Sequence, residues 1–83
     1  MTEPAPLKLF VSVPENRVAQ PIVYELVKRF DVVPNIRRAN VEAHSGWMIL
    51  ELSGDPAARD GAIAYLLELG CTVNRMEGDV VAG

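Results

Sequence analysis

The residues best placed to bind a ligand lie together at 34–38, in the sequence PNIRR. The asparagine and arginine side chains of this segment are hydrogen-bond donors, and they lie where the chain is expected to begin a strand of a sheet. Ile36 is out of phase with the alternation of the residues that follow it, which predicts a bulge or an irregular strand entry at 35–37. A bulge leaves backbone groups free for a ligand, so we predict a binding site in this segment.

Catalysis and metal binding have little support in the sequence. The chain has one histidine, His44, which stands beside Ser45 in a turn without an acid to orient it, so we interpret it as a solvated turn residue rather than a general base. The single cysteine, Cys71, is either a small buried apolar residue or a reactive thiol. No cluster has metal-ligand spacing and no glycine-rich phosphate loop is present. We expect no enzyme activity, no metal and no cofactor.

Composition predicts one folded domain without a nucleic-acid or membrane function. The chain has 83 residues, of which 49% are hydrophobic and 23% are charged, as in ordinary globular domains. A net charge of −3 and a pI near 5.0 provide no global attraction to nucleic acid or to an anionic membrane. The first residues lack the regions of a signal peptide, and no apolar run approaches the ~20 residues of a membrane-spanning helix. We expect a cytoplasmic protein.

The hydrophobic periodicity predicts four strands and two helices in the order βαββαβ. Asn16 is a candidate N-cap of the first helix, Gly70 a C-terminal cap of the second, and His44 lies in a hairpin turn. In the second strand, Ala39 and Val41 fall on the face opposite Arg38 and its polar neighbours. The predicted strands are 7–13, 36–43, 47–53 and 71–76, the helices are 18–30 and 56–69, the lead-in is 1–6 and the tail is 77–83.

This order is typical of an α+β ferredoxin-like sandwich, with a four-stranded antiparallel sheet and two helices on one face. Gly61, in the second helix, is interpreted as a point of close packing on the sheet. The predicted buried helix faces are Ile22, Val23, Leu26, Val27 and Phe30 in the first helix, and Ala62, Ile63, Leu66 and Leu67 in the second.

The sheet face without helices is predicted to carry Phe10, Trp47 and Ile49. Such a face is rarely left bare in water, so we expect these three residues to form an interface, either for self-association or for a ligand or partner. RNA recognition is a weaker alternative, because Ile49 stands where a second aromatic residue is expected and the chain is acidic.

Three segments resemble the NIL domain, namely FDVVPNIRRANV, GWMILELSG and AIAYLLELGCTV, and the resemblance extends over about 7–76. This small ferredoxin-like domain is found at the C-terminus of methionine-importer ATPase subunits, in ferredoxin fusions and as stand-alone proteins. The resemblance implies a regulatory domain that pairs with its own copy and binds methionine.

The same resemblance makes Asn35 the leading ligand residue, because its amide can donate to a carboxylate and accept from an ammonium group. Arg37 departs from the apolar residue of the family motif, and it is either a carboxylate clamp or a solvated charge on a strand edge. Pro34 and Ile36 are expected to shape the site.

Two functions remain open on these grounds. The first is a homodimeric sensor of a sulfur-containing amino acid such as methionine. The second is a protein-interaction module that docks a ferredoxin, an ABC transporter ATPase or a sulfur-metabolism enzyme and binds no small ligand.

Overall fold

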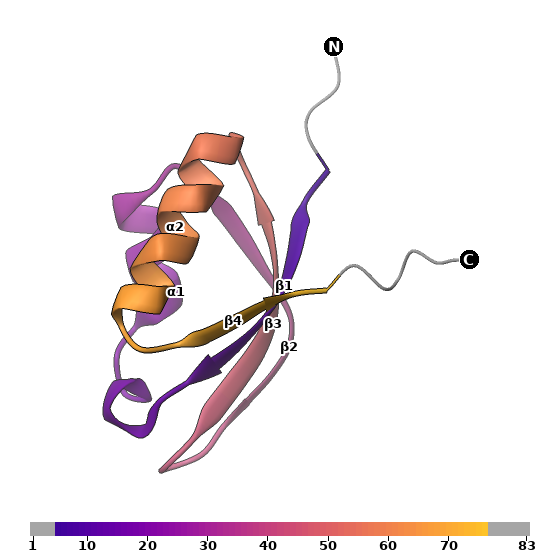
Figure 1. Ribbon diagram of the computed structural model, residues 1–83. Coiled ribbons are helices and arrows are strands. Elements are labelled where there is room, and N and C mark those ends of the chain that lie inside the picture. The colour runs from indigo at the N-terminus through magenta and orange to yellow at the C-terminus, as the bar shows by residue number, and fades with distance from the viewer. Residues whose placement is uncertain (1–4, 77–83) are drawn as a thin grey trace, which may run out of the picture.

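A computed structural model describes residues 5–76 of the chain. It has the predicted βαββαβ order and α+β class, with a short 3₁₀ helix, η1, added after the first strand (Figure 1). Most of the predicted lead-in and the whole of the predicted tail lie outside the described residues. The elements are β1 (Leu7–Val13), η1 (Glu15–Arg17), α1 (Ile22–Arg29), β2 (Val33–Val41), β3 (Gly46–Ser53), α2 (Pro56–Glu68) and β4 (Thr72–Arg75).

The four strands form one antiparallel sheet in the order β2-β3-β1-β4, and both helices cover the same face (Figure 1). β3 and β1 are therefore the central strands, and Phe10 stands directly opposite Ile49. β2 and β4 are the edges. Within the described part of the chain, no helix is long and apolar enough to cross a membrane.

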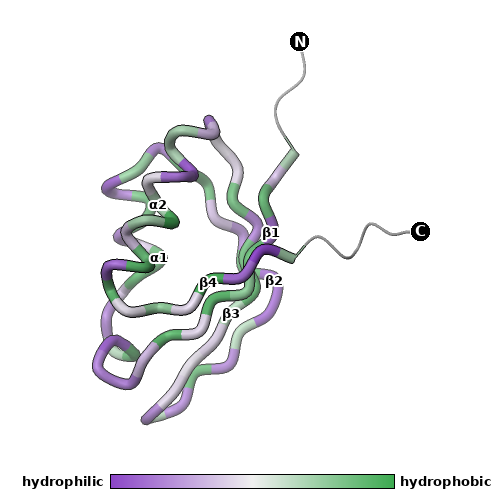
Figure 2. The backbone as a smooth tube through the Cα atoms, in the orientation of Figure 1, coloured by the Kyte–Doolittle hydropathy of each residue, from purple (hydrophilic) through white to green (hydrophobic). Residues whose placement is uncertain are grey.

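The core lies between the central strands and the helices, where apolar residues gather (Figure 2). Burial alternates strictly along β3, because successive side chains of a strand point to opposite faces. Met48, Leu50 and Leu52 are buried on the helix side, and Trp47 and Ile49 lie on the other face, where they were predicted. The three buried residues pack with residues of β1 and of both helices, including Leu9, Val11, Leu26, Ala62 and Leu66.

The first helix is shorter than predicted. α1 begins only at Ile22 because Pro21, at its N-cap with ψ 71°, holds a backbone geometry outside the helix. Asn16 lies inside η1, whose N-cap is Pro14, so the prediction that Asn16 caps the helix is wrong. Phe30 closes α1 in an extended conformation, with its backbone N–H donating to the Leu26 carbonyl.

The second strand begins earlier than predicted, at Val33, and includes Pro34. Proline has no N–H for a strand ladder, but β2 is an edge strand, where proline is tolerated. The predicted irregularity is confirmed, because the register of β2 against β3 shifts between Ile36 and Arg38. Ala43 lies beyond the strand, in a turn closed by a hydrogen bond from the Glu42 N–H to the Ser45 carbonyl.

The helices bury a narrower face than their spacing predicts. Val27 is 51% exposed and Leu67 is 55% exposed, so the prediction that both are buried is wrong. Each helix packs on the sheet with only one of its faces, and Val27 and Leu67 point away from that face. Gly61 packs closely, but against a neighbouring aromatic ring rather than the sheet, since an added Cβ would lie 3.2 Å from Phe30.

Candidate functional site

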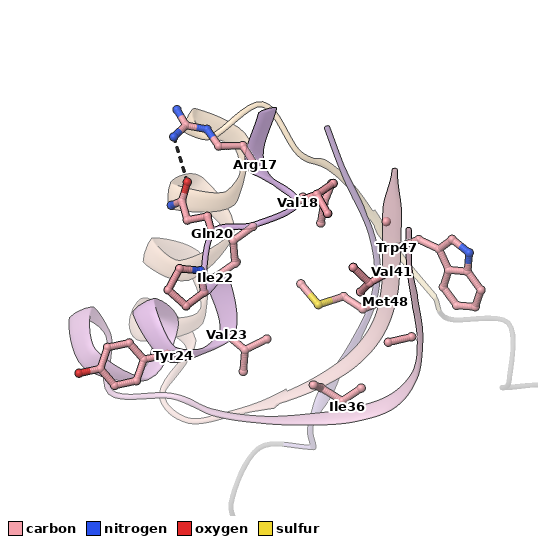
Figure 3. Close-up of a pocket in the computed structure, with 14 residues that line it drawn as sticks. Arg17, Val18, Gln20, Ile22, Val23, Tyr24, Ile36, Val41, Trp47 and Met48 are labelled. Atoms are coloured by element: carbon pink, nitrogen blue, oxygen red, sulfur yellow. Dashed lines mark hydrogen bonds between the residues drawn. The ribbon is translucent and has the colours of Figure 1, made fainter. Parts of the chain in front are cut away.

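A cleft of about 270 Å³ opens on the helix side of the sheet, between η1–α1 and the β2–β3 hairpin (Figure 3). α1 is short, and although it contacts β2 it does not cover the helix-side residues Ile36 and Val41. Ile36 is 48% exposed and Val41 is 68% exposed, although the register places both on the same face as the buried Leu50. Part of the inner face of β2 is therefore an apolar wall that α1 leaves exposed.

Apolar side chains make up most of the cleft. Val23, Val41 and Met48 point into it, whereas the ring of Trp47 projects from the other face of the sheet (Figure 3). Pro21 is also part of the lining and sets the direction in which α1 leaves the cleft. Such a lining favours an apolar group over a charged one.

Two polar residues, Arg17 and Gln20, lie at one end of the cleft (Figure 3). The Arg17 Nη1 donates to Gln20 Oε1 at 2.9 Å, and the Arg17 Nε donates to the Leu69 carbonyl at 3.3 Å. Gln20 Nε2 donates in turn to Glu25 Oε1 at 2.6 Å. The polar end is thus held in place by contacts with both helices.

The pKa of Glu25 lies below its ordinary value, first because the Tyr65 hydroxyl donates to its carboxylate and next because the Gln20 amide does so. The carboxylate therefore stays ionised and fixes the amide of Gln20. The guanidinium of Arg17, bonded to that amide, remains the positive group at the rim of the cleft.

The sheet divides the four predicted ligand residues between its two faces. Ile36 lines the cleft, and Pro34, opposite the buried Leu52, lies on the same face. Asn35 stands opposite Glu51, on the face without helices. The structure therefore brings Ile36 to the cleft and places Asn35 away from it.

Arg37 occupies the bulge and lies 3.8 Å from a carboxylate oxygen of Glu51, on the face without helices. Its side chain is 56% exposed, and an exposed pair at this distance contributes little to stability. In this arrangement Arg37 is a solvated charge on the edge strand and does not reach into the cleft.

The three predicted interface residues lie together on that helix-free face. The rings of Phe10 and Trp47 are stacked, with centroids 5.6 Å apart and planes 16° apart. Ile49 stands opposite Phe10 in the register of β1 and β3. All three are half-buried.

The remaining reactive side chains are poorly placed for chemistry. His44 Nδ1 lies 2.6 Å from Glu15 Oε2, and both side chains are largely exposed, as expected of a solvated turn residue. Cys71 is buried, in agreement with its interpretation as a small buried apolar residue. Burial also raises the pKa of its thiol. Among residues 5–76, no group of His, Cys, Asp or Glu is arranged to hold a metal ion.

The sequence interpretation missed Arg17 and Gln20, which it treated as loop and early helix. One feature of the sequence could have located these two residues, namely the proline that follows Gln20 at position 21. Proline is favoured at the start of a helix and disfavoured within it. The residues just before Pro21 therefore lie outside the helix, in the loop between β1 and α1 that crosses one end of the sheet.

Comparison with known proteins gives a consistent picture. The sequence model of the NIL domain matches residues 9–75. A crystal structure of the C-terminal domain of an ABC transporter ATP-binding protein from Enterococcus faecalis superposes with a TM-score of 0.77 at 18% identity, covering 90% of this chain and 88% of that one. At this identity, the likeness shows a shared fold. No curated protein sequence matches the chain.

Proposed function

Because this chain belongs to the NIL domain family, we propose that it is a non-enzymatic, cytoplasmic regulatory domain that binds a small amino acid with an apolar side chain, such as methionine. The likeness to the C-terminal domain of an ABC transporter ATP-binding protein supports a role beside a transporter ATPase. The observation that carries the proposal is the apolar cleft between α1 and β2, with Arg17 at its rim.

The size and lining of the cleft suit such a ligand. A volume of about 270 Å³ lies just below the usual range of sites for drug-sized molecules, about 300–1,000 Å³, and suits a ligand as small as an amino acid. The side chain of methionine, unbranched and polarisable, adapts well to an irregular apolar space. Val23, Met48 and Ile36 would surround it.

The polar groups of an amino acid have partners at the borders of the cleft. Arg17 Nη2 makes no hydrogen bond within residues 5–76 and is free to bind a carboxylate. At the bulge between Ile36 and Arg38, β2 is out of register, and its backbone groups there are open to an ammonium or carboxylate. Asn35 lies on the face of β2 opposite the cleft, and its amide is a separate candidate for contacting a ligand at the edge of this strand.

We also propose that the domain works as a homodimer joined through β2. This long edge strand exposes three large apolar side chains, those of Val33, Ile36 and Val41. Tyr24, on α1 beside the cleft, is 61% exposed. Two copies of an edge strand related by a two-fold axis would pair their backbones and cover these residues. Sedimentation as a monomer throughout the micromolar range would remove this part of the proposal.

Thermal unfolding with methionine, homocysteine or cysteine tests ligand binding. Methionine at about 100 times its Kd would add about 2.7 kcal/mol, which corresponds to a rise in Tm of roughly 11–22 °C for a domain of this size. The sensor proposal fails if none of the three amino acids raises the Tm at millimolar concentration.

Two matched variants locate the site. Ile36→Glu places a carboxylate in the cleft and is expected to abolish the methionine-dependent rise in Tm. Leu67→Glu makes the same change at an exposed apolar position of α2, outside the lining of the cleft and away from β2, and is expected to leave it intact. Asn35→Ala measures what the amide contributes. Equal losses in Ile36→Glu and Leu67→Glu would show that the cleft is not the site.

A further inference from the structure

The face of the sheet without helices forms a second surface, which the proposed ligand site does not use. We propose that this face docks an acidic protein segment that also carries apolar side chains. The surface consists of an apolar centre on the two inner strands and a polar rim on the two edge strands.

The centre is made by Phe10, Trp47 and Ile49. Phe10 and Ile49 face each other directly across β1 and β3, and Trp47 stacks on Phe10 from the next position of the same face. Their half-burial comes from contact with one another, since neither helix covers this side (Figure 1). They therefore present a continuous apolar patch at the middle of the sheet.

The rim follows from the register of the edge strands. Arg38 of β2 stands opposite Ile49, and Asn40 stands opposite Trp47. On the other side, Asn74 of β4 stands opposite Phe10. An apolar centre enclosed by hydrogen-bonding side chains is the usual anatomy of a protein–protein interface.

The charge of this face selects the partner. Among residues 5–76, two acids lie on or beside this face against the three cations Lys8, Arg37 and Arg38. Glu51 stands opposite Lys8 and lies 3.8 Å from Arg37, and Glu42 accepts a hydrogen bond from Asn40 at 3.3 Å. Arg38 is exposed, and its guanidinium forms no ion pair within residues 5–76. The chain as a whole carries a net charge of −3, so this positive face is a local exception. A complementary partner is acidic, while a second copy of the same face would meet like charge.

Single-stranded nucleic acid fits the same face less well. Bases stack on aromatic rings whose faces are open, but Phe10 and Trp47 each use one face against the other. A phosphate backbone also needs a track of cations, and here Glu51 lies between Lys8 and Arg37 in the sheet.

Trp47 is the only tryptophan of the chain and reports directly on this face. The probe is a synthetic glutamate-rich peptide with two phenylalanines, and it is compared with the same peptide carrying lysine for each glutamate and with oligothymidylate. We expect the acidic peptide to change the Trp47 fluorescence saturably and to bind more weakly as salt is raised. No saturable change at millimolar peptide, equal binding of the lysine peptide, or tighter binding of oligothymidylate would each overturn the proposal.

Charge-reversal variants distinguish this face from the net charge of the chain. Arg38→Glu is expected to weaken binding of the acidic peptide by about tenfold. Lys28→Glu makes the same change on α1, on the far side of the sheet, and is expected to have little effect. Equal weakening by both variants would show attraction by net charge alone and would overturn the proposal. Ile36→Glu, which blocks the cleft, is expected to leave peptide binding unchanged, so the two proposals stand or fall separately.

Discussion

The hydroxyl of Tyr65 donates a hydrogen bond to Glu25 Oε1 at 2.6 Å, and it joins α2 to α1 across 40 positions of the chain. Gln20 donates to the same oxygen at 2.6 Å. The guanidinium of Arg29 lies 4.8 Å from the centre of the Tyr65 ring, on the same side of the helix pair. The Glu25 carboxylate therefore serves two purposes. It joins α1 to α2, and it also holds Gln20 at the rim of the cleft.

The stability of the fold in acid is expected to depend on this carboxylate. The bond from Tyr65 is the largest cause that lowers the pKa of Glu25 from 4.5. A carboxylate whose pKa is lower in the folded state stabilises the fold above its unfolded pKa, and this contribution is lost as the pH falls through the folded pKa. Tyr65→Phe should therefore lower the free energy of unfolding at neutral pH and flatten its decline below about pH 5.

Urea unfolding at a series of pH values measures this effect. Tyr24→Phe is the matched control, because Tyr24 lies on α1, is 61% exposed and donates no hydrogen bond to a residue of 5–76. Its pH dependence should match that of the unchanged protein. Parallel curves for Tyr65→Phe and the unchanged protein would show that the bond does not hold the pKa of Glu25 down.

Adjacent leucines of α2 should differ sharply in their contribution to stability. Leu66 is fully buried, and Leu66→Ala is expected to lower the free energy of unfolding by about 2–5 kcal/mol, through lost burial and the cavity left behind. Leu67 is 55% exposed, so Leu67→Ala is expected to cost no more than about 0.5 kcal/mol. Denaturant unfolding compares the two directly, and equal losses would contradict the observed orientation of α2.

Two glycines with positive φ should respond differently to alanine. Gly54, with φ 137°, precedes α2, and an added Cβ would lie 2.9 Å from the backbone oxygen of Asp31. Gly70, with φ 92°, ends α2, and its Cβ would meet only Pro14, at 3.6 Å. Gly54→Ala adds a backbone clash to the strain of about 1–3 kcal/mol expected at either site. A lower Tm for Gly54→Ala than for Gly70→Ala is the expected result, and the reverse order would refute it.

The thiol of Cys71 should react only when the fold opens. The side chain is 5% exposed, and burial raises the pKa of the thiol above its ordinary value of 9.0. Thiolate is the reactive form, so alkylation at neutral pH should be slow in buffer and fast in denaturant. Rapid alkylation of the folded protein would favour the reactive-thiol interpretation instead.

Local patterns were sufficient for most of the architecture. The alternation in 47–53 predicted which residues of β3 are buried, because a strand with one face on a core repeats every two residues. The phase break at Ile36 predicted the bulge, which the register shift before Arg38 confirms. The start of α1 was harder to predict, since Val18 continues the helical pattern and only the backbone at Pro21 excludes it from the helix.

The candidate site was predicted less well, because its parts are far apart in the chain. Arg17 and Val41 border the same cleft, yet no spacing in the sequence relates them. The segment at 34–38 drew attention through its polar residues, but successive residues of a strand point to opposite faces, and this separates Asn35 from Ile36.

The sequence by itself determined the order of the elements, the bulge in β2 and the apolar residues of the helix-free face, because each depends on periodicity within a few residues. Tertiary structure alone decided that α1 leaves Ile36 and Val41 of β2 exposed, that Tyr65 meets Glu25, and that Phe10 stacks on Trp47. These relationships depend on where whole elements come to rest on the sheet, and that position is set by the packing of the entire core rather than by any one segment.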